Sequence, residues 1–305
     1  MKPSILILAT SLILTVACNF KSETQISTIE NYKITDTMTI DLWSGNRTTS
    51  RQTYERDVLF AILTATREEF GIWKIVETTK DYTEIEESNI FDEFKHDLTV
   101  TVAGNVKFEN REKIVIHKPI MKGLLGFRVL IINEEDQTTF SEASNARNLK
   151  NLRHGIPLTW ADAELFRSNG FSVVEEGDFD GLFDDLKSRK FDYTAFGANE
   201  VNDVFQERAA KTSGLKIEDN IIIYYPFPLL FYINPNNKLL AERVKRGLEI
   251  ISENGTLNLI FEKHYSEILS SINFTSRVVF ELENPKLPTE LKDFKSDLLP
   301  LYNGH

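Results

Sequence analysis

Apolar and polar positions along the chain follow two periods in turn, one typical of strands and one typical of helices. Short apolar runs predict strands at residues 37–43, 73–77, 98–102, 126–132, near 152, 173–174, 192–196 and 221–233. Apolar side chains at helical spacing predict helices at residues 58–70, 161–168, 182–186, 238–252 and 257–269. Strands that alternate with helices in this way indicate an α/β fold with parallel sheets covered by helices.

The N-terminus has a different pattern. Lys2 precedes an uncharged apolar run at residues 5–16, and Ala17 precedes Cys18, the chain's single cysteine. The run is shorter than the roughly 20 residues that a membrane-spanning helix needs, so it predicts a secretory signal instead. The position of Cys18 resembles the lipobox of bacterial lipoproteins, which implies a lipid on its thiol. Thr15 replaces the usual leucine of a lipobox, and cleavage without lipidation is the alternative.

These features predict where the mature protein works. We expect removal of a signal peptide at residues 1–17, followed by a lipid-anchored flexible tether at residues 18–32, which is polar and lacks periodicity. Nothing beyond the signal is apolar enough to cross a membrane, so the lipid is the expected membrane contact. The expected location is the periplasm, with anchoring to either bacterial membrane left open.

Composition narrows the classes of function. The net charge of -11 at pH 7 disfavours nucleic acid as a partner. With 41% hydrophobic residues the chain can bury a large core, and one cysteine allows no internal disulfide. The five histidines show no metal-ligand spacing, and serine-hydrolase and phosphate-loop motifs are absent from the sequence. We therefore expect no metal, no other cofactor and no catalytic centre.

Several segments resemble family 3 bacterial solute-binding proteins, the extracytoplasmic receptors typified by polar amino-acid uptake systems. Residues 232–265 resemble the family's closing strand, helix, glycine break and helix. Residues 109–112, leading to Pro119, resemble its arginine motif, and residues 155–159 stand in the place of its glycine-threonine loop. The resemblance covers roughly residues 34–268. Further segments resemble an uncharacterised substrate-binding-domain subgroup, at residues 119–128, 190–193 and 284–288.

The resemblance implies a two-lobed, type II periplasmic-binding-protein fold with two crossover strands and a ligand cleft between the lobes. Carried over to this chain, lobe 1 comprises residues 33–121 plus 227–270, and lobe 2 comprises residues 127–222. Residues 271–305 have no counterpart in the amino-acid receptors. They are expected to form a C-terminal tail that serves a partner, or a strap across the lobes.

Two tryptophans and a threonine are the first candidate ligand contacts. Thr159 and Asp162 form a capping box, so a helix is expected to begin at Thr159. In the resembled fold that helix N-terminus faces the cleft and suits an anion, although Thr159 has the alternative of merely starting a helix. Trp43 follows the first strand, and Trp160 faces it from the other lobe. Both are expected to cover the ligand, with core packing as the alternative.

The remaining candidates come from charged and polar positions. Arg111 stands where amino-acid receptors clamp the ligand carboxylate, a task that suits the planar guanidinium; an exposed surface arginine is the alternative. Gly197 stands where those receptors offer an aspartate to the ligand ammonium, and Asn199 or Glu200 is expected to substitute. The family's Phe-Ser-x-Pro-Tyr motif is also replaced, at residues 116–120. The ligand is therefore not expected to be a standard amino acid held in the standard way.

The resemblance implies a function as well as a fold. It implies a monomeric receptor that captures a small polar molecule and delivers it to an inner-membrane ABC permease, without chemistry of its own. A receptor of the same fold that reports ligand to a membrane sensor is the alternative. An enzyme is not expected, because the residues after Leu269 are too few for the added catalytic domain that cell-wall-cleaving relatives carry.

Overall fold

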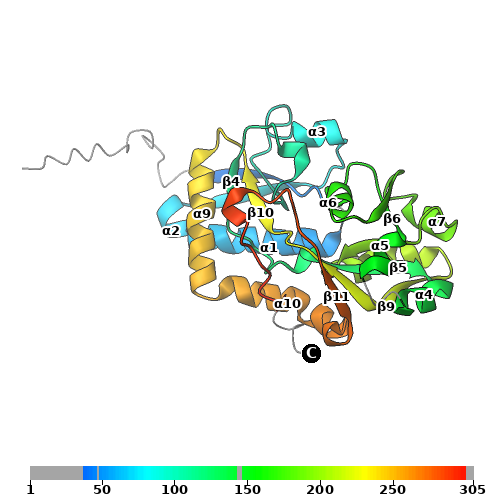
Figure 1. Ribbon diagram of the computed structural model, residues 1–305. Helices are drawn as coiled ribbons and strands as arrows, with labels where there is room; N and C mark the ends of the chain where they lie inside the picture. Colours follow the sequence, from blue (N-terminus) through cyan, green and yellow to red (C-terminus); the bar gives the residue numbers. More distant parts are fainter. Residues whose placement is uncertain (1–36, 47, 143–145, 300–305) are drawn as a thin grey trace, which may run out of the picture. The chain divides into compact units, whose positions relative to one another are not determined.

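A computed structural model describes residues 37–46, 48–142 and 146–299 (Figure 1). The chain divides into residues 1–33 and a second unit of residues 34–305, and all described residues belong to the second unit. The expected signal peptide, the tether and Cys18 lie outside the described residues. Within the described part of the chain, no helix combines the length and the apolar character needed to cross a bilayer.

The first sheet has five strands in the order β2-β1-β3-β10-β4. They are β1 (Met38–Trp43), β2 (Trp73–Thr78), β3 (Leu98–Val102), β4 (Ile114–Ile116) and β10 (Leu229–Ile233). β1 pairs in parallel with β2 and β3, whereas β10 is antiparallel to β3 and β4. Side chains of β1 alternate between buried and more exposed, because one strand face packs on the core and the next side chain points the other way.

The second sheet has six strands in the order β11-β9-β5-β8-β6-β7. They are β5 (Phe127–Asn133), β6 (Arg153–Ile156), β7 (Ser172–Glu175), β8 (Tyr193–Gly197), β9 (Leu215–Tyr224) and β11 (Val278–Glu281). Every residue of β5 is buried, which explains why its sequence does not alternate and is apolar except at Arg128 and Asn133. The two sheets, each with its helices, give the two-lobed α/β fold that the sequence predicts.

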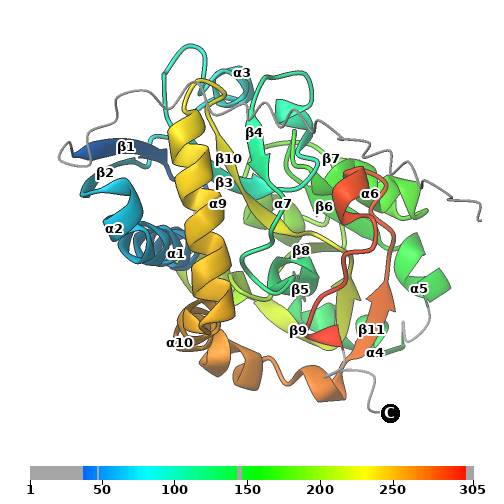
Figure 2. The same cartoon turned by 90° about the vertical axis from the view of Figure 1, so that its left-hand side faces the viewer.

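Helices of the first lobe pack on one another as well as on their sheet. α1 lies against α9 and α10, as Figure 2 shows for α1 and α9. An added Cβ at Gly247 of α9 would lie 2.6 Å from the carbonyl oxygen of Ile62 in α1, so only glycine allows this approach. The helices of this lobe are α1 (Thr49–Ala65), α2 (Arg67–Phe70), α3 (Glu84–Ser88), α9 (Lys238–Glu253) and α10 (Thr256–Ser271).

Short helices cover the second sheet. They are α4 (Gln137–Glu142), α5 (Ala146–Asn151), α6 (Asp162–Ser168), α7 (Leu182–Lys187) and α8 (Val201–Glu207). The expectation that a helix begins at Thr159 is wrong. The N-cap position of α6 is Ala161, without a side-chain cap, and Thr159 has a φ of 70°, in the left-handed region. Its backbone N–H donates instead to Oε1 of Glu175 at 3.2 Å, because the chain turns sharply before the helix starts.

The chain passes between the sheets twice, through residues 117–126 and 225–228. These crossing segments touch: the N–H of Tyr225 donates to the carbonyl of Gly126 at 3.1 Å. A Cβ at Gly126 would lie 2.1 Å from the Tyr225 oxygen, so a side chain here would force the segments apart.

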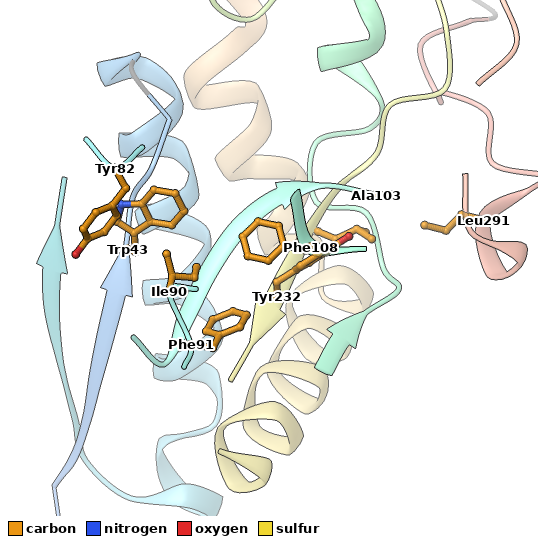
Figure 3. Packing of buried hydrophobic residues seen from close by; sticks show 9 residues of the cluster. Trp43, Tyr82, Ile90, Phe91, Ala103, Phe108, Tyr232 and Leu291 are labelled. Atoms are coloured by element: carbon orange, nitrogen blue, oxygen red, sulfur yellow. The ribbon is translucent and has the colours of Figure 1, made fainter. Parts of the chain in front are cut away.

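A third connection runs through residues 278–299, which we call the C-terminal strap. Its β11 pairs in parallel with β9 of the second sheet (Figure 1). The strap then passes beside α6 (Figure 2), where Lys286 pairs with Glu164 at 3.1 Å. Leu291 finally enters a buried cluster of the first lobe with Phe108 and Tyr232 (Figure 3). The strap therefore contacts both lobes.

Candidate ligand-binding site

A cavity of about 540 Å³ lies between the two sheets, and both lobes line it. Its size falls within the range of small-molecule sites. The first lobe contributes residues at the ends of β1 and β3 and in the loops that follow, among them Trp43, Thr48, Arg51, Tyr82 and Lys107. The second lobe contributes residues near the ends of β5, β6, β7 and β8, among them Arg128, Thr159, Trp160, Asp178 and Glu200.

The aromatic wall of the first lobe is held by hydrogen bonds behind it. Trp43 ends β1, and its Nε1 donates to the carbonyl of Lys80 at 3.0 Å. The ring of Tyr82 lies beside it, with centroids 5.5 Å apart (Figure 3). The Tyr82 hydroxyl contacts Nε2 of buried His96 at 3.0 Å. Both rings are thus fixed in orientation before any ligand arrives.

The polar part of the first lobe centres on a buried acid. Glu55 of α1 pairs with Nε of Arg51 at 2.7 Å and accepts a hydrogen bond from Asn46 at 3.3 Å. Burial raises the pKa of Glu55 to about 7, since desolvation outweighs the effect of Arg51. Thr48 lies nearby, and its hydroxyl hydrogen is shared between Oδ1 of Asn46 at 2.9 Å and, across the cavity, Oε2 of Glu200 at 3.3 Å. That hydrogen bond joins the two lobes.

The second lobe is organised by a buried arginine. Arg128, in β5, is 4% exposed; it pairs with Asp162 at 2.7 Å and approaches Glu200 to 3.8 Å. Its Nε donates to the Tyr225 hydroxyl at 2.5 Å, and that hydroxyl donates to Asp162 at 2.9 Å. Burial opposes the charge of Arg128, but Asp162, Tyr225 and Glu200 together raise its pKa above the usual value. The network ties β5, α6 and the second crossing segment together.

Three aromatic rings form the opposite wall of the cavity. The centroid of Trp160 lies 5.6 Å from that of Phe179 and 5.9 Å from that of Phe196. Phe179 and Phe196 are 4% and 1% exposed, whereas Trp160 is only half-buried. The two phenylalanines therefore support Trp160 from behind, and the indole reaches the cavity.

Four of the six candidate contacts from the sequence line this one cavity, and two do not. Trp43, Thr159, Trp160 and Glu200 lie together there. The lining does not include Arg111 or Asn199.

The two outlying candidates have different surroundings. Arg111 is exposed, and its Nη2 donates to Ser88 at 3.4 Å. Asn199 is fully buried, and its side-chain atoms have no hydrogen-bond partner among the described residues. The residues just before Arg111, Lys107 and Phe108, line the cavity instead because the chain turns there in a short 3-10 helix.

Sequence reasoning missed Arg128, Tyr82, Arg51 and Asp178. Arg128 carried a usable signal, because a charge inside an otherwise apolar strand has to find a buried partner. Arg51 lies in the first turn of α1, which begins before the helix predicted at residues 58–70. Tyr82 and Asp178 lie in loops whose course the sequence pattern did not define. Among the described residues, no three His, Cys, Asp or Glu side chains are arranged to hold a metal ion.

Solved structures of bacterial binding proteins share this fold. The probable amino-acid ABC transporter extracellular-binding protein ytmK from Bacillus subtilis is 17% identical, with a TM-score of 0.53, covering 76% of this chain and 99% of its own. An ancestral arginine-binding protein bound to arginine is 15% identical, with a TM-score of 0.52; the match covers 74% of this chain and 98% of its own. The substrate-binding protein AbpA from Streptococcus pneumoniae, bound to L-arginine, is 14% identical, with a TM-score of 0.51; the match covers 75% of this chain and 95% of its own.

No protein-family model matches the sequence, and no curated protein matches it. The structural likeness establishes the fold, so the expected two-lobed α/β architecture is confirmed. At these identities the likeness does not extend to the ligand, which has to be inferred from the cavity of this chain itself.

Proposed function

We propose that this protein is an extracytoplasmic solute-binding receptor that captures a small polar molecule between its lobes. The observation that carries the proposal is the origin of the cavity walls: both lobes contribute aromatic and charged side chains to one space. A ligand there contacts both lobes at once and stabilises the arrangement in which they are close. The Thr48–Glu200 hydrogen bond supports this reading, because it forms only when the lobes meet.

Capture requires no bond making or breaking. The lobes bend about the two crossing segments, which touch at Gly126 and Tyr225. Ligand bound to the open form shifts the population toward the closed form, because only the closed form offers contacts from both walls. Release follows when a partner favours the open form again.

The partner that best suits such a receptor is an inner-membrane ABC permease. Two structural neighbours, ytmK and AbpA, are described as amino-acid ABC transporter binding proteins, and this chain shares their fold. The rival is a ligand-sensing lipoprotein that acts on a membrane sensor. The C-terminal strap supports the sensing alternative, because a segment that contacts both lobes moves when the lobes move and can pass that motion to a partner. Pull-down from detergent-solubilised membranes distinguishes the two functions: recovery of a permease supports transport, and recovery of a sensor supports sensing.

The anchor is a proposal of its own. Export through the signal at residues 1–17 and lipid attachment at Cys18 would hold the receptor at a bacterial membrane while leaving it monomeric. Mass spectrometry of the N-terminal peptide should show a diacylglyceryl-modified Cys18. Cys18→Ala should move the protein from the membrane fraction to the soluble periplasmic fraction; retention in the membrane would reject the anchor.

A thermal-shift screen tests the receptor function. Amino acids, polyamines, organic acids, nucleosides and peptides are each added to the mature protein. A ligand at a hundred times its dissociation constant should add about 2.7 kcal/mol to the unfolding free energy. Trp160→Ala should abolish the shift, whereas Arg111→Ala should reduce it only if Arg111 contacts ligand in solution. A well-folded protein that responds to no compound would reject the proposal.

A further inference from the structure

We infer that the cavity takes an organic cation that carries no carboxylate, such as a protonated or quaternary amine. The inference rests on the proposed receptor function and names the class of ligand for the same cavity. Three features lead to it: the pairing of the basic side chains, the excess of carboxylates, and the indole of Trp160 that faces the cavity.

The basic side chains of the cavity already have acidic partners. Arg51 pairs with Glu55, and Arg128 pairs with Asp162 and Glu200. Lys107, the third basic residue of the lining, pairs with Glu87. A ligand carboxylate would have to break one of these pairs, and breaking a buried pair leaves a carboxylate without its partner. The cavity therefore disfavours ligands with a carboxylate.

Carboxylates outnumber the basic groups in the same lining. Four acidic residues face three basic ones: Glu87, Asp162, Asp178 and Glu200 against Arg51, Lys107 and Arg128. Among the described residues Asp178 has no ion pair; it accepts one hydrogen bond, from the N–H of Gly181 at 2.9 Å. With the chain's net charge of -11 behind it, the cavity attracts a positive ligand.

The aromatic walls suit the same charge. Trp43 lines the cavity from the first lobe and Trp160 from the second, and an indole is the most favourable ring for a cation–π contact. The protein's own cations lie over other rings of the lining: Arg208 lies 4.3 Å from the centroid of Phe179, and Lys80 lies 4.5 Å from that of Tyr82. Among the described residues no cation lies over Trp43 or Trp160. Trp43 is 4% exposed and packs in a buried cluster, so it offers the cavity only an edge, whereas half-buried Trp160 is the ring that can receive a ligand cation.

Matched ligand pairs test the inference by calorimetry on the purified mature protein at low salt. Agmatine is arginine without its carboxylate, and we expect it to bind at least tenfold more tightly than L-arginine. Choline should likewise bind at least tenfold more tightly than 3,3-dimethylbutan-1-ol, which has its shape but no charge. Arginine binding as tightly as agmatine, or the neutral alcohol as tightly as choline, would overturn the inference.

Variants locate the contact. Trp160→Ala should weaken agmatine binding tenfold or more, because Trp160 is the half-buried indole of the lining. Asp178→Asn should weaken it several-fold, and added salt should reduce that difference because Asp178 is exposed. Asp184→Asn is the control: Asp184 is also exposed and has no ion pair among the described residues, but it lies outside the lining and should leave binding unchanged. An equal effect of the two asparagine variants would remove Asp178 from the site.

The outcomes separate this inference from the receptor function. If agmatine, choline and putrescine all fail to bind while a neutral or acidic solute binds, the cation inference is wrong and the receptor stands. If no solute of the thermal-shift panel binds either, both fall together.

Discussion

The two lobes bury ionisable groups near the same cavity, but burial moves their pKa values in opposite directions. In the first lobe, desolvation raises the pKa of the Glu55 carboxyl to about 7. In the second lobe, desolvation and then the charge of Arg128 lower the pKa of buried His154 to about 3. The first lobe therefore changes its charge near neutral pH, whereas the second keeps a neutral histidine beside a permanent ion-pair network. A single fold thus contains one lobe that titrates near neutral pH and one that does not.

Removing the cation from each wall should show the largest difference. Arg128→Met leaves Asp162 and Glu200 buried without a cation, so the unfolding free energy should fall by about 3–5 kcal/mol at pH 7. Arg51→Met should reduce it by only about 1 kcal/mol, because Glu55 can take up a proton when its partner is lost. Urea denaturation of both variants measures the two values. Equal losses would remove the distinction between the walls.

The pH response of the first lobe comes next in size. The pKa of Glu55 is higher in the folded protein than in the unfolded chain, so the folded state binds the extra proton and this group's contribution to stability falls as pH rises. Between pH 5 and pH 8 the loss should be on the order of 2 kcal/mol. Glu55→Gln lacks this loss, so the stability of the variant relative to the wild type should rise over that range. A difference that stays constant with pH would contradict the shifted pKa.

The second lobe should respond in the opposite sense and slightly less. The pKa of His154 is lower when folded, so the unfolded chain takes up the proton and stability falls as pH drops below about 6.5. His154→Phe keeps an aromatic ring stacked on Tyr193 and removes the titration. Between pH 7 and pH 5 the wild type should lose about 2 kcal/mol more than this variant. Parallel denaturation midpoints of the two proteins would exclude a buried neutral histidine.

The smallest contrast uses the same residue type on both walls. Thr159 has a φ of 70°, so Thr159→Gly should raise the unfolding free energy by about 1 kcal/mol. Thr48 has a φ of -111° and bonds through its hydroxyl to Asn46 and Glu200, so Thr48→Gly should lower it by about 1 kcal/mol. Thermal denaturation detects both changes. Shifts of the same sign would show that backbone conformation does not decide the effect.

Much of the framework was predictable from the sequence, because long apolar periods reflect burial directly. The strands β1, β3 and β5 and the helices α9 and α10 lie where the pattern places them, since their apolar faces are continuous. The elements β4, β11, α3 and α8 are short, and their pairing depends on distant segments that a local pattern does not contain. The sharp turn at Thr159 mimics a capping box in sequence, which explains the misplaced helix start.

The candidate site was predictable where it depends on strand ends. Trp43, Trp160 and Glu200 follow predicted strands, and the ends of neighbouring strands meet at one edge of a sheet. Arg128 was not identified because its role depends on Asp162 and Tyr225, each from a different part of the chain. Arg111 carried the family's motif, but the course of the loop before it determines which side chain reaches the cavity.

The C-terminal strap has a consequence for the order of folding. Leu291 completes the cluster that holds Trp43, so the first lobe joins residues from nearly opposite ends of the chain, whereas β5 to β9 of the second lobe come from one continuous stretch. Contacts so distant in sequence form slowly, because a long loop must close first. The second lobe is therefore expected to fold early, and the first lobe only after the last residues have been synthesised. If the proposed export precedes folding, this order keeps the residues of the first lobe unfolded during the crossing.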